Sequence, residues 1–312
     1  MKVILICTQK EFDQKRINQI QHYSKITWIK DDQVDITKVK ELYDGEEKVL
    51  AFSPVSFNWI TPKEIYNQIK NVKYICLTTT GYDYIDVEKC KLHKIKVTNV
   101  PHYSTNAVAE YAIFMMFSLS KKFPEQIKSN FKYEFSEELL MNEISTKSAG
   151  IVGLGHIGMR IADLTSRLGM KTYYWSRKTR NPKHKFLPID QLLSTVDVLF
   201  PALPVSNDTS NFLNKSLLSK LRKESLVVDI THFEHGNKGI TDREYLLKRI
   251  HENRLGGLAF ESFSQKMDKQ RGNIFITAPL AWYTDNSLEN NIQIWADTII
   301  SCINGKPTNI IY

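Results

Sequence analysis

Three glycines near the middle of the chain, Gly153, Gly155 and Gly158, lie between an apolar run and an amphipathic stretch. The run at 149–154 has the length of a buried strand, and residues 157–168 show apolar positions at helical spacing. In such a pattern the first glycine permits a tight turn, and the second lets another group approach the backbone. The third lets the helix pack closely on the strand. The pattern predicts a strand–turn–helix unit within a parallel α/β sheet.

Short apolar runs alternate with amphipathic stretches along the whole chain, which is typical of parallel sheets flanked by helices. A first series of five strands is expected at 2–7, 26–29, 49–52, 74–77 and 95–100, with helices at 11–23 and 62–70. A second series of six strands is expected at 149–154, 171–174, 196–201, 225–230, 256–260 and 273–277. Its helices are expected at 157–168, 188–194, 214–221 and 242–252. The first series has flavodoxin-like proportions, and the second has those of a dinucleotide-binding fold.

Two domains of ordinary size are expected in 312 residues. A helix at 287–303 would return the chain to the first domain, and 306–312 would form a terminal tail. The predicted fold is α/β, with a Rossmann domain at 101–284 inserted in a smaller flavodoxin-like substrate domain at 1–100 and 285–312. The stretch from Ala107 to Ser120 is apolar on nearly every side. Its helix is therefore expected to be buried all round, between domains or between subunits.

The glycine turn predicts a phosphate site, because a helix amino terminus offers unpaired N–H groups and the positive end of its dipole. The alternative is an ordinary tight turn without a ligand. NAD-binding folds usually have an acidic residue at the end of the next strand. Here that strand is followed by Ser176, Arg177 and Lys178. The planar guanidinium of Arg177 suits a 2′-phosphate, so NADP(H) is expected in preference to NAD(H). The alternative is a solvated basic loop.

Composition limits the other function classes. The net charge of +8 is spread along the chain, so nucleic-acid binding is weakly supported, and a positive balance also suits an anionic cofactor. The four cysteines show no CxxC spacing, which predicts neither a zinc site nor a disulfide framework and favours a reducing cytoplasm. The apolar start at 2–7 is too short for a signal peptide, and no stretch is long enough to span a membrane.

Three longer motifs resemble the D-isomer-specific 2-hydroxyacid dehydrogenase family: residues 80–86, residues 95–110, and Leu203-Pro204 followed by Thr209. The resemblance implies a cleft between the two domains and a homodimer built on the helix from Ala107 to Ser120. It implies that Thr80 and Gly81 bind the substrate, with His102 close to the same cleft, whereas Asp83 and Asp86 are expected to shape their loop by hydrogen bonding. The candidate cofactor residues are then Gly153, Gly155, His156, Ile157, Gly158, Ser176, Arg177, Lys178, Leu203, Pro204, Thr209 and Glu261.

The resemblance also locates three positions at which this chain departs from the family. Family members use an arginine to hold the keto acid, a histidine as general acid, and a glutamate that orients the histidine. On the alignment these positions are occupied by His232, Pro279 and Lys266 respectively. Glu261 replaces an aspartate that helps to place the nicotinamide amide, so cofactor geometry is expected to survive.

These losses bear on the reaction. A positioned general acid contributes about 10²–10⁴ in rate, and a charge-assisted carboxylate anchor contributes roughly 1.5–3 kcal/mol. Without both, reduction of 2-keto acids by the family mechanism is expected to be lost. His232 is a candidate proton donor, Lys266 a candidate for holding an anionic substrate, and Tyr283 and His102 are weaker candidates. The alternatives are a polar loop residue for His232, an exposed lysine for Lys266 and an aromatic packing role for Tyr283.

Three hypotheses follow from the sequence. The first is an NADPH-dependent reductase acting on an imine or on a ketone without the usual carboxylate. The second is a catalytically inactive NADP(H)-binding protein that acts as a sensor or structural partner. The third is a nucleic-acid or scaffold role, which rests only on the positive charge.

Overall fold

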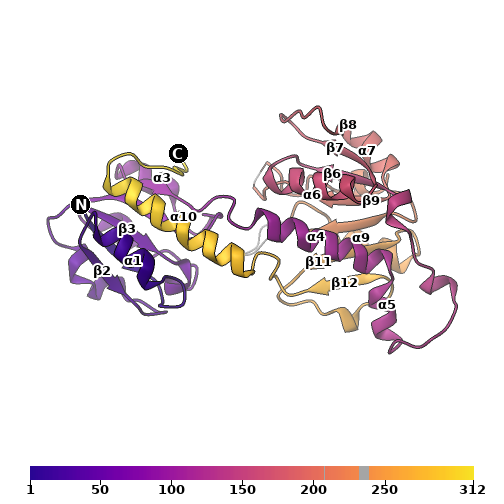
Figure 1. Cartoon of the computed structure of the whole chain (residues 1–312), viewed down its shortest axis with the longest axis horizontal. Coiled ribbons are helices and arrows are strands. Elements are labelled where there is room, and N and C mark those ends of the chain that lie inside the picture. Colours follow the sequence, from indigo (N-terminus) through magenta and orange to yellow (C-terminus); the bar gives the residue numbers. More distant parts are fainter. Residues whose placement is uncertain (207, 232–238) are drawn as a thin grey trace. The chain divides into compact units, whose positions relative to one another are not determined.

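The computed structural model describes residues 1–206, 208–231 and 239–312. The chain forms two compact units (Figure 1). Unit 1 comprises Met1–Ser104 and Thr284–Tyr312, and unit 2 comprises Thr105–Tyr283. The sequence predicts the corresponding boundaries at 100/101 and 284/285.

Unit 1 contains a five-stranded parallel sheet in the order β2-β1-β3-β4-β5. Its strands are β1 (Lys2–Ile6), β2 (Ile26–Ile29), β3 (Lys48–Phe52), β4 (Val72–Leu77) and β5 (Lys96–Thr98). This order is that of flavodoxin-like doubly wound folds. The five strands confirm the first predicted series.

Alternate side chains of these strands supply two cores, as expected for a sheet covered on both faces. Val3 and Leu5 lie in the core with helices α1 (Gln14–Gln21) and α10 (Asp285–Ile303). Trp295 of α10 is fully buried there, where its Nε1 donates to the carbonyl of Cys76 at 3.1 Å. Ile4 and Ile6 lie in the other core, with residues from α2 (Glu64–Asn67), α3 (Val87–Leu92) and 3₁₀ turns at Ile36–Lys38, Lys40–Leu42 and Pro54–Phe57.

Two features of unit 1 differ from the sequence prediction or sharpen it. Residues 306–312 are not a free tail: Ile310 forms an antiparallel bridge with Thr98, and the Ile311 amide donates to Val97 at 2.9 Å. The unpaired edge of β5 provides the partners for this segment. Helix α3 was not predicted, but Asp86 caps it by accepting from the Lys89 amide at 3.0 Å. The expected local hydrogen bonding of Asp86 is thereby confirmed.

Unit 2 contains a seven-stranded parallel sheet in the order β12-β11-β10-β9-β6-β7-β8. Its strands are β6 (Ser148–Val152), β7 (Lys171–Trp175), β8 (Lys185–Phe186), β9 (Val198–Pro201), β10 (Leu226–Asp229), β11 (Gly257–Glu261) and β12 (Ile274–Thr277). The chain reverses its strand order beside β6, as in dinucleotide-binding folds. The prediction of six strands is wrong by one, because the two residues of β8 are too short to show a period.

Helices cover both faces of this sheet (Figure 1). Ile151, Phe200 and Val228 pack with α4 (Thr105–Ser120) and α6 (His156–Arg167). Val152, Leu199 and Val227 pack on the opposite face, with α7 (Ile189–Thr195), α8 (Lys215–Leu218) and α9 (Arg243–His251). The remaining elements are α5 (Phe123–Lys128) and 3₁₀ turns at Glu137–Leu139, Ile144–Thr146 and Met267–Lys269.

Within unit 2 alone, helix α4 is buried on one side only, and the sequence prediction that it is buried between domains or between subunits stays a prediction. One side, including Ala112, Met115 and Leu119, is fully buried in the core of unit 2. Phe114 on another side has 46% of its surface exposed. A helix that covers one face of a sheet needs only one apolar side for that task, so the remaining apolar surface of α4 requires another explanation. Within the described part of the chain, no helix is both long and apolar enough to cross a bilayer.

Candidate active site

The turn between β6 and α6 depends on two close backbone contacts. Gly153 adopts φ +105°, in the region that favours glycine, and its amide donates to the Trp175 carbonyl at 2.9 Å. A Cβ atom on Gly158 would lie 2.0 Å from the carbonyl oxygen of Gly153. No side chain therefore fits at Gly158, and the first turn of α6 sits directly against the end of β6.

The amino end of α6 has the space and donors that a phosphate needs. A Cβ on Gly155, the N-cap residue, would meet no atom within 4 Å. The Gly155 N-cap makes no side-chain hydrogen bond to this end, and a helix amino terminus is a favourable place for an anion. His156 is exposed and Ile157 half-buried beside it. These residues fit the pyrophosphate of a dinucleotide.

The segment after β9 lies against the same turn. A Cβ on Gly153 would come within 2.8 Å of both the Ala202 carbonyl oxygen and a methyl group of Leu203. Thr209 is 1% exposed, and its hydroxyl donates to the Pro204 carbonyl and accepts from the Ser206 amide. Leu203 thus borders the turn, whereas Thr209 holds the loop that contains Pro204.

The loop after β7 presents two exposed cations at the carboxyl end of the strand beside β6. Ser176 is buried, and its hydroxyl accepts from the Thr179 amide at 3.2 Å. Arg177 and Lys178 are exposed. Arg180, which sequence reasoning did not single out, donates to the Ser176 carbonyl at 2.9 Å and lies 4.1 Å from the Phe186 ring centre. The loop is therefore shaped by its own hydrogen bonds and offers positive charge to solvent.

A buried ion pair links the ends of β10 and α9. The Asp229 side chain is fully buried and accepts from Arg243 Nε at 2.7 Å. The same carboxylate accepts from the Thr231 amide at 3.0 Å, and Arg243 also donates to the Thr231 carbonyl at 2.8 Å. Sequence reasoning missed Arg243, because it lies 14 positions beyond Asp229 and only the fold brings the two together.

Glu261 joins the end of β11 to the segment after β12. It is 8% exposed, and its Oε1 accepts from the Ala281 amide at 2.8 Å. Its backbone carbonyl accepts from Arg243 at 3.3 Å. The carboxyl ends of β10, β11 and β12 are therefore connected by two charged side chains.

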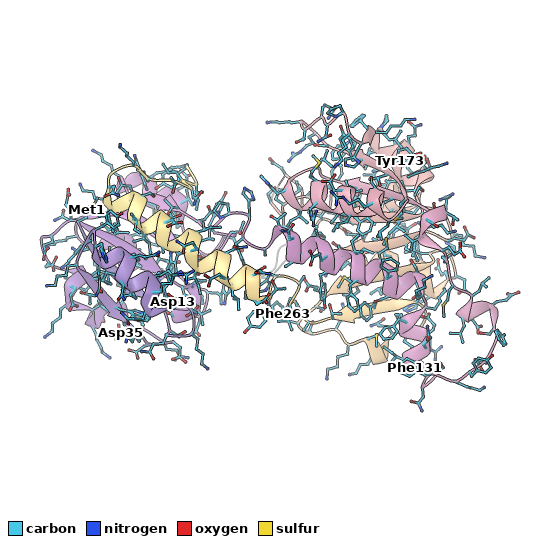
Figure 2. All side chains as sticks on the ribbon, viewed as in Figure 1. Met1, Asp13, Asp35, Phe131, Tyr173 and Phe263 are labelled. Atoms are coloured by element: carbon cyan, nitrogen blue, oxygen red, sulfur yellow. The ribbon has the colours of Figure 1, made fainter. Side chains whose placement is uncertain are left out.

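The other candidate catalytic residues of unit 2 follow β11 and β12 along the chain and lie on the surface. Lys266 and Tyr283 are exposed, and the rings of Tyr283 and Trp282 make an edge contact with centroids 5.3 Å apart. Phe263, labelled in Figure 2, is 71% exposed. His232 lies outside the described residues. Among those that are described, no cluster of His, Cys, Asp and Glu could hold a metal ion.

The predicted substrate loop of unit 1 is held largely by its own groups. The Thr80 hydroxyl donates to the Val100 carbonyl at 2.7 Å, so it is engaged in shaping the loop. The Thr79 hydroxyl donates to the Gly81 carbonyl at 2.7 Å and also lies 2.6 Å from the Tyr84 phenol oxygen. Burial raises the pKa of Tyr84, which keeps its phenol protonated. His102 is exposed and adopts φ +62°, a strained conformation for a residue with a side chain.

Comparison with known proteins agrees with this geometry. The sequence model of the D-isomer specific 2-hydroxyacid dehydrogenase NAD binding domain matches residues 113–285, more than half of the chain. Glycerate dehydrogenase of Methylorubrum extorquens is 23% identical over 259 residues, covering 78% of this chain and 80% of the relative.

Two solved structures are similar over the full length of both chains. One is an acyclic imino acid reductase in complex with NADPH and D-Arg, with a TM-score of 0.81 and 26% identity. The other is the NAD-complexed form of a D-isomer specific 2-hydroxyacid dehydrogenase from Lactobacillus delbrueckii ssp. bulgaricus, with a TM-score of 0.81 and 21% identity. The second likeness bears on the fold alone.

Substitution of the glycines by alanine separates packing from cofactor binding. Gly158→Ala is expected to destabilise unit 2 by about 1–3 kcal/mol, because its methyl group clashes with backbone. Gly155→Ala should fold normally but weaken NADPH binding about tenfold or more, since its methyl group occupies the phosphate position. Thermal unfolding and fluorescence titration measure the two effects, and Gly45→Ala, in open space of unit 1, is the control. Unchanged NADPH affinity in Gly155→Ala would show that phosphate does not bind at this turn.

Proposed function

Because this chain belongs to the D-isomer-specific 2-hydroxyacid dehydrogenase family, we propose that it is an NADP(H)-dependent reductase of acyclic imino acids. Nicotinamide-dependent oxidoreduction is the activity of the family. The finer proposal is supported above all by the intact dinucleotide turn, taken together with the expectation from the sequence that His232 and Pro279 stand in place of the family's arginine and histidine.

The preference for NADP(H) is supported by the loop after β7. In NAD-binding folds, a carboxylate in this loop usually hydrogen-bonds the two free ribose hydroxyls of the cofactor. Residues 175–180 include no carboxylate. Arg177 and Lys178 are exposed there instead, and Arg180 adds a third positive charge. A guanidinium pairs well with a phosphate in two parallel hydrogen bonds. When bound, the reduced nicotinamide supplies the hydride.

The replaced residues favour a C=N bond over a C=O bond on chemical grounds. Hydride addition to a carbonyl creates an alkoxide, which a general acid must protonate. Hydride addition to a protonated imine gives a neutral amine, so no proton donor is required at that step. An arginine beside the cationic carbon–nitrogen group would oppose its charge. Loss of both residues is therefore expected to slow the reduction of a keto acid strongly and the reduction of an imine much less.

Within this proposal the remaining candidates have defined tasks. Lys266 would bind the carboxylate of an imino acid, and Tyr283 would hydrogen-bond its nitrogen. His232, unlike an arginine, need not carry a positive charge, so its imidazole would tolerate the cation where an arginine would not. Thr80, Gly81 and His102 remain predicted substrate-binding residues. The likeness to an acyclic imino acid reductase in complex with NADPH and D-Arg supports the choice of cofactor and substrate class together.

We propose that two copies of the chain associate through α4. A hollow on this helix and α6 is lined by Ile113, Phe114, Phe117, Leu164 and Leu168, with Glu110 and Arg167 at its border. In a two-fold arrangement each copy presents the same patch, so Glu110 of one copy can meet Arg167 of the other. Phe131, labelled in Figure 2, is 61% exposed in the segment that follows α5 and adds apolar surface.

A cytoplasmic location remains the proposal made from cysteine usage. Cys7, Cys76, Cys90 and Cys302 are all buried free thiols, which is expected in a reducing compartment. Nucleic-acid binding remains without structural support, since neither the glycine turn nor the buried charge network requires it.

Cofactor preference can be tested by binding alone. We expect NADPH to bind at least about tenfold more tightly than NADH. Arg177→Ala should weaken NADPH binding about ten- to a hundredfold, as expected for loss of roughly 1.5–3 kcal/mol of charge-assisted hydrogen bonding, and leave NADH affinity unchanged. Lys248→Ala, an exposed cation on α9, is the control. Tighter binding of NADH by the wild type would contradict the assignment.

Substrate class can be tested by following NADPH oxidation with 2-oxo acids in the presence and absence of primary amines. The rate with amine is expected to exceed the rate without it at least about a hundredfold, because only the imine escapes the need for a general acid. His232→Ala should change the imine rate less than tenfold. Equal rates without amine would indicate a carbonyl reductase. Background rates throughout would favour an NADP(H)-binding protein without turnover.

Oligomeric state tests the α4 interface. The wild type is expected to have the mass of a dimer by light scattering at micromolar concentration, whereas Phe114→Glu should have the mass of a monomer with an unaltered circular dichroism spectrum. A charge placed in an apolar interface is costly to bury. Leu92→Glu, at an 80% exposed position in unit 1, is the matched control and should remain dimeric. If the wild type has the mass of a monomer, the proposed α4 interface is contradicted.

A further inference from the structure

The three segments that contain the family's catalytic positions are joined by one side chain that the family comparison does not single out. Those segments follow β10, β11 and β12, and Arg243 contacts the first two directly. It reaches the third through Glu261, whose carboxylate accepts from the Ala281 amide. We propose that Arg243 is the positioning residue of the hydride-transfer site. This inference rests on the proposed reductase function.

At β10, Arg243 holds both the side chain and the backbone of the strand end. Its Nε donates to Asp229 Oδ2 at 2.7 Å, and its terminal nitrogen donates to the Thr231 carbonyl at 2.8 Å. Asp229 in turn accepts from the Thr231 amide and hydroxyl. The chain direction at Thr231 is therefore set from both sides, immediately before the family's arginine position at 232.

The same guanidinium also fixes the backbone at the carboxyl end of β11. It donates to the Glu261 carbonyl at 3.3 Å and lies 4.7 Å from the ring centre of Phe260. Glu261 is the residue expected to place the nicotinamide amide. Because Glu261 also holds the Ala281 amide, a shift of Arg243 would move the backbone beside the replaced histidine position as well.

Helix stability does not explain an arginine at this position. Arg243 is the first residue of α9, where the positive end of the helix dipole disfavours a cation. Asp242 already caps the helix by accepting from the Tyr245 amide at 3.0 Å. The arrangement costs helix stability locally and gives a fixed geometry at the strand ends.

Lysine could not reproduce these contacts. Among the described residues, Arg243 donates from three different nitrogens toward three acceptors, in the planar fork that a guanidinium provides. An ammonium group has one nitrogen, and from that point it could satisfy Asp229 while releasing the carbonyls of Thr231 or Glu261. Arg243→Lys therefore keeps the charge and removes the geometry.

The chain provides a matched control in the same helix. Arg249 is 5% exposed, and its guanidinium donates to the carbonyls of Leu218, Leu221 and Arg254. These acceptors precede β10 and β11 in the chain and so lie away from the carboxyl ends. Arg249→Lys removes a buried arginine of equal size without touching the proposed network.

The first measurement needs neither substrate nor turnover. Amide hydrogen exchange of the unliganded protein should be at least about tenfold faster in Arg243→Lys for peptides covering 229–231 and 278–283, and unchanged there in Arg249→Lys. Asp229→Asn, which weakens the ion pair from the opposite side, should give the same pattern. If both peptides of Arg243→Lys exchange at the same rate as in the wild type, the inference is overturned, whatever reaction the protein catalyses.

The second measurement separates positioning from simple destabilisation. Arg243→Lys should bind NADPH within about threefold of the wild type but lower kcat for imine reduction about ten- to a hundredfold, as misplacement of reacting groups does. Its KM should change little, and deuterated NADPH should show a larger isotope effect. Arg249→Lys should keep kcat even where its melting temperature falls equally. Equal kcat losses in both variants would show that Arg243 has only a structural role. If the wild type shows no turnover, the proposed reductase function is rejected, but the hydrogen-exchange result remains valid.

Discussion

The contact between Gly158 and the carbonyl oxygen of Gly153 is the constraint on which the organisation of unit 2 depends. Because a Cβ at Gly158 would lie 2.0 Å from that oxygen, the start of α6 rests on the end of β6 with nothing between them. The helix dipole and the first-turn N–H groups are thereby placed at the carboxyl edge of the sheet. Strands β7 and β9, which pair with β6 on either side, bring Ser176–Lys178 and Leu203 to the same edge.

The other half of this edge is organised by charge. Asp229, Arg243 and Glu261 are buried or nearly so, and each has defined hydrogen-bond partners. Buried charges are tolerated only when they are paired in this way. These contacts fix the strand ends beside the positions at which we propose that the family's substrate-binding arginine and proton-donating histidine are replaced. This arrangement is compatible with the imine reduction that we propose, in which the site must mainly place the hydride acceptor.

The two sheets protect the unpaired backbone of one edge strand in different ways. In unit 2 the edge strand β8 has two residues and pairs with β7 over Tyr173 and Tyr174. In unit 1 the edge strand β5 is covered by the last residues of the chain, through the bridge between Thr98 and Ile310. Both arrangements limit the unpaired backbone that an open sheet would expose. Helix α4, in contrast, keeps an apolar side exposed, which is the surface we assign to a second copy.

The sequence by itself determined the elements whose signals are local. Period and turn chemistry predict the six strands and four helices of the series that includes the glycine turn, and they predict the five apolar runs of unit 1. They also predict that Asp86 makes local hydrogen bonds, although not that it caps a helix. Tertiary structure alone decided the rest: the two-residue strand β8, the pairing of residues 310–311 with β5, the exposed side of α4, and the joining of Asp229, Arg243 and Glu261. Each of these depends on partners distant in sequence or on which face is covered. Local periodicity does not identify such partners, because it indicates only that a segment has an apolar face. It does not indicate which residues pack against that face or pair with a strand edge.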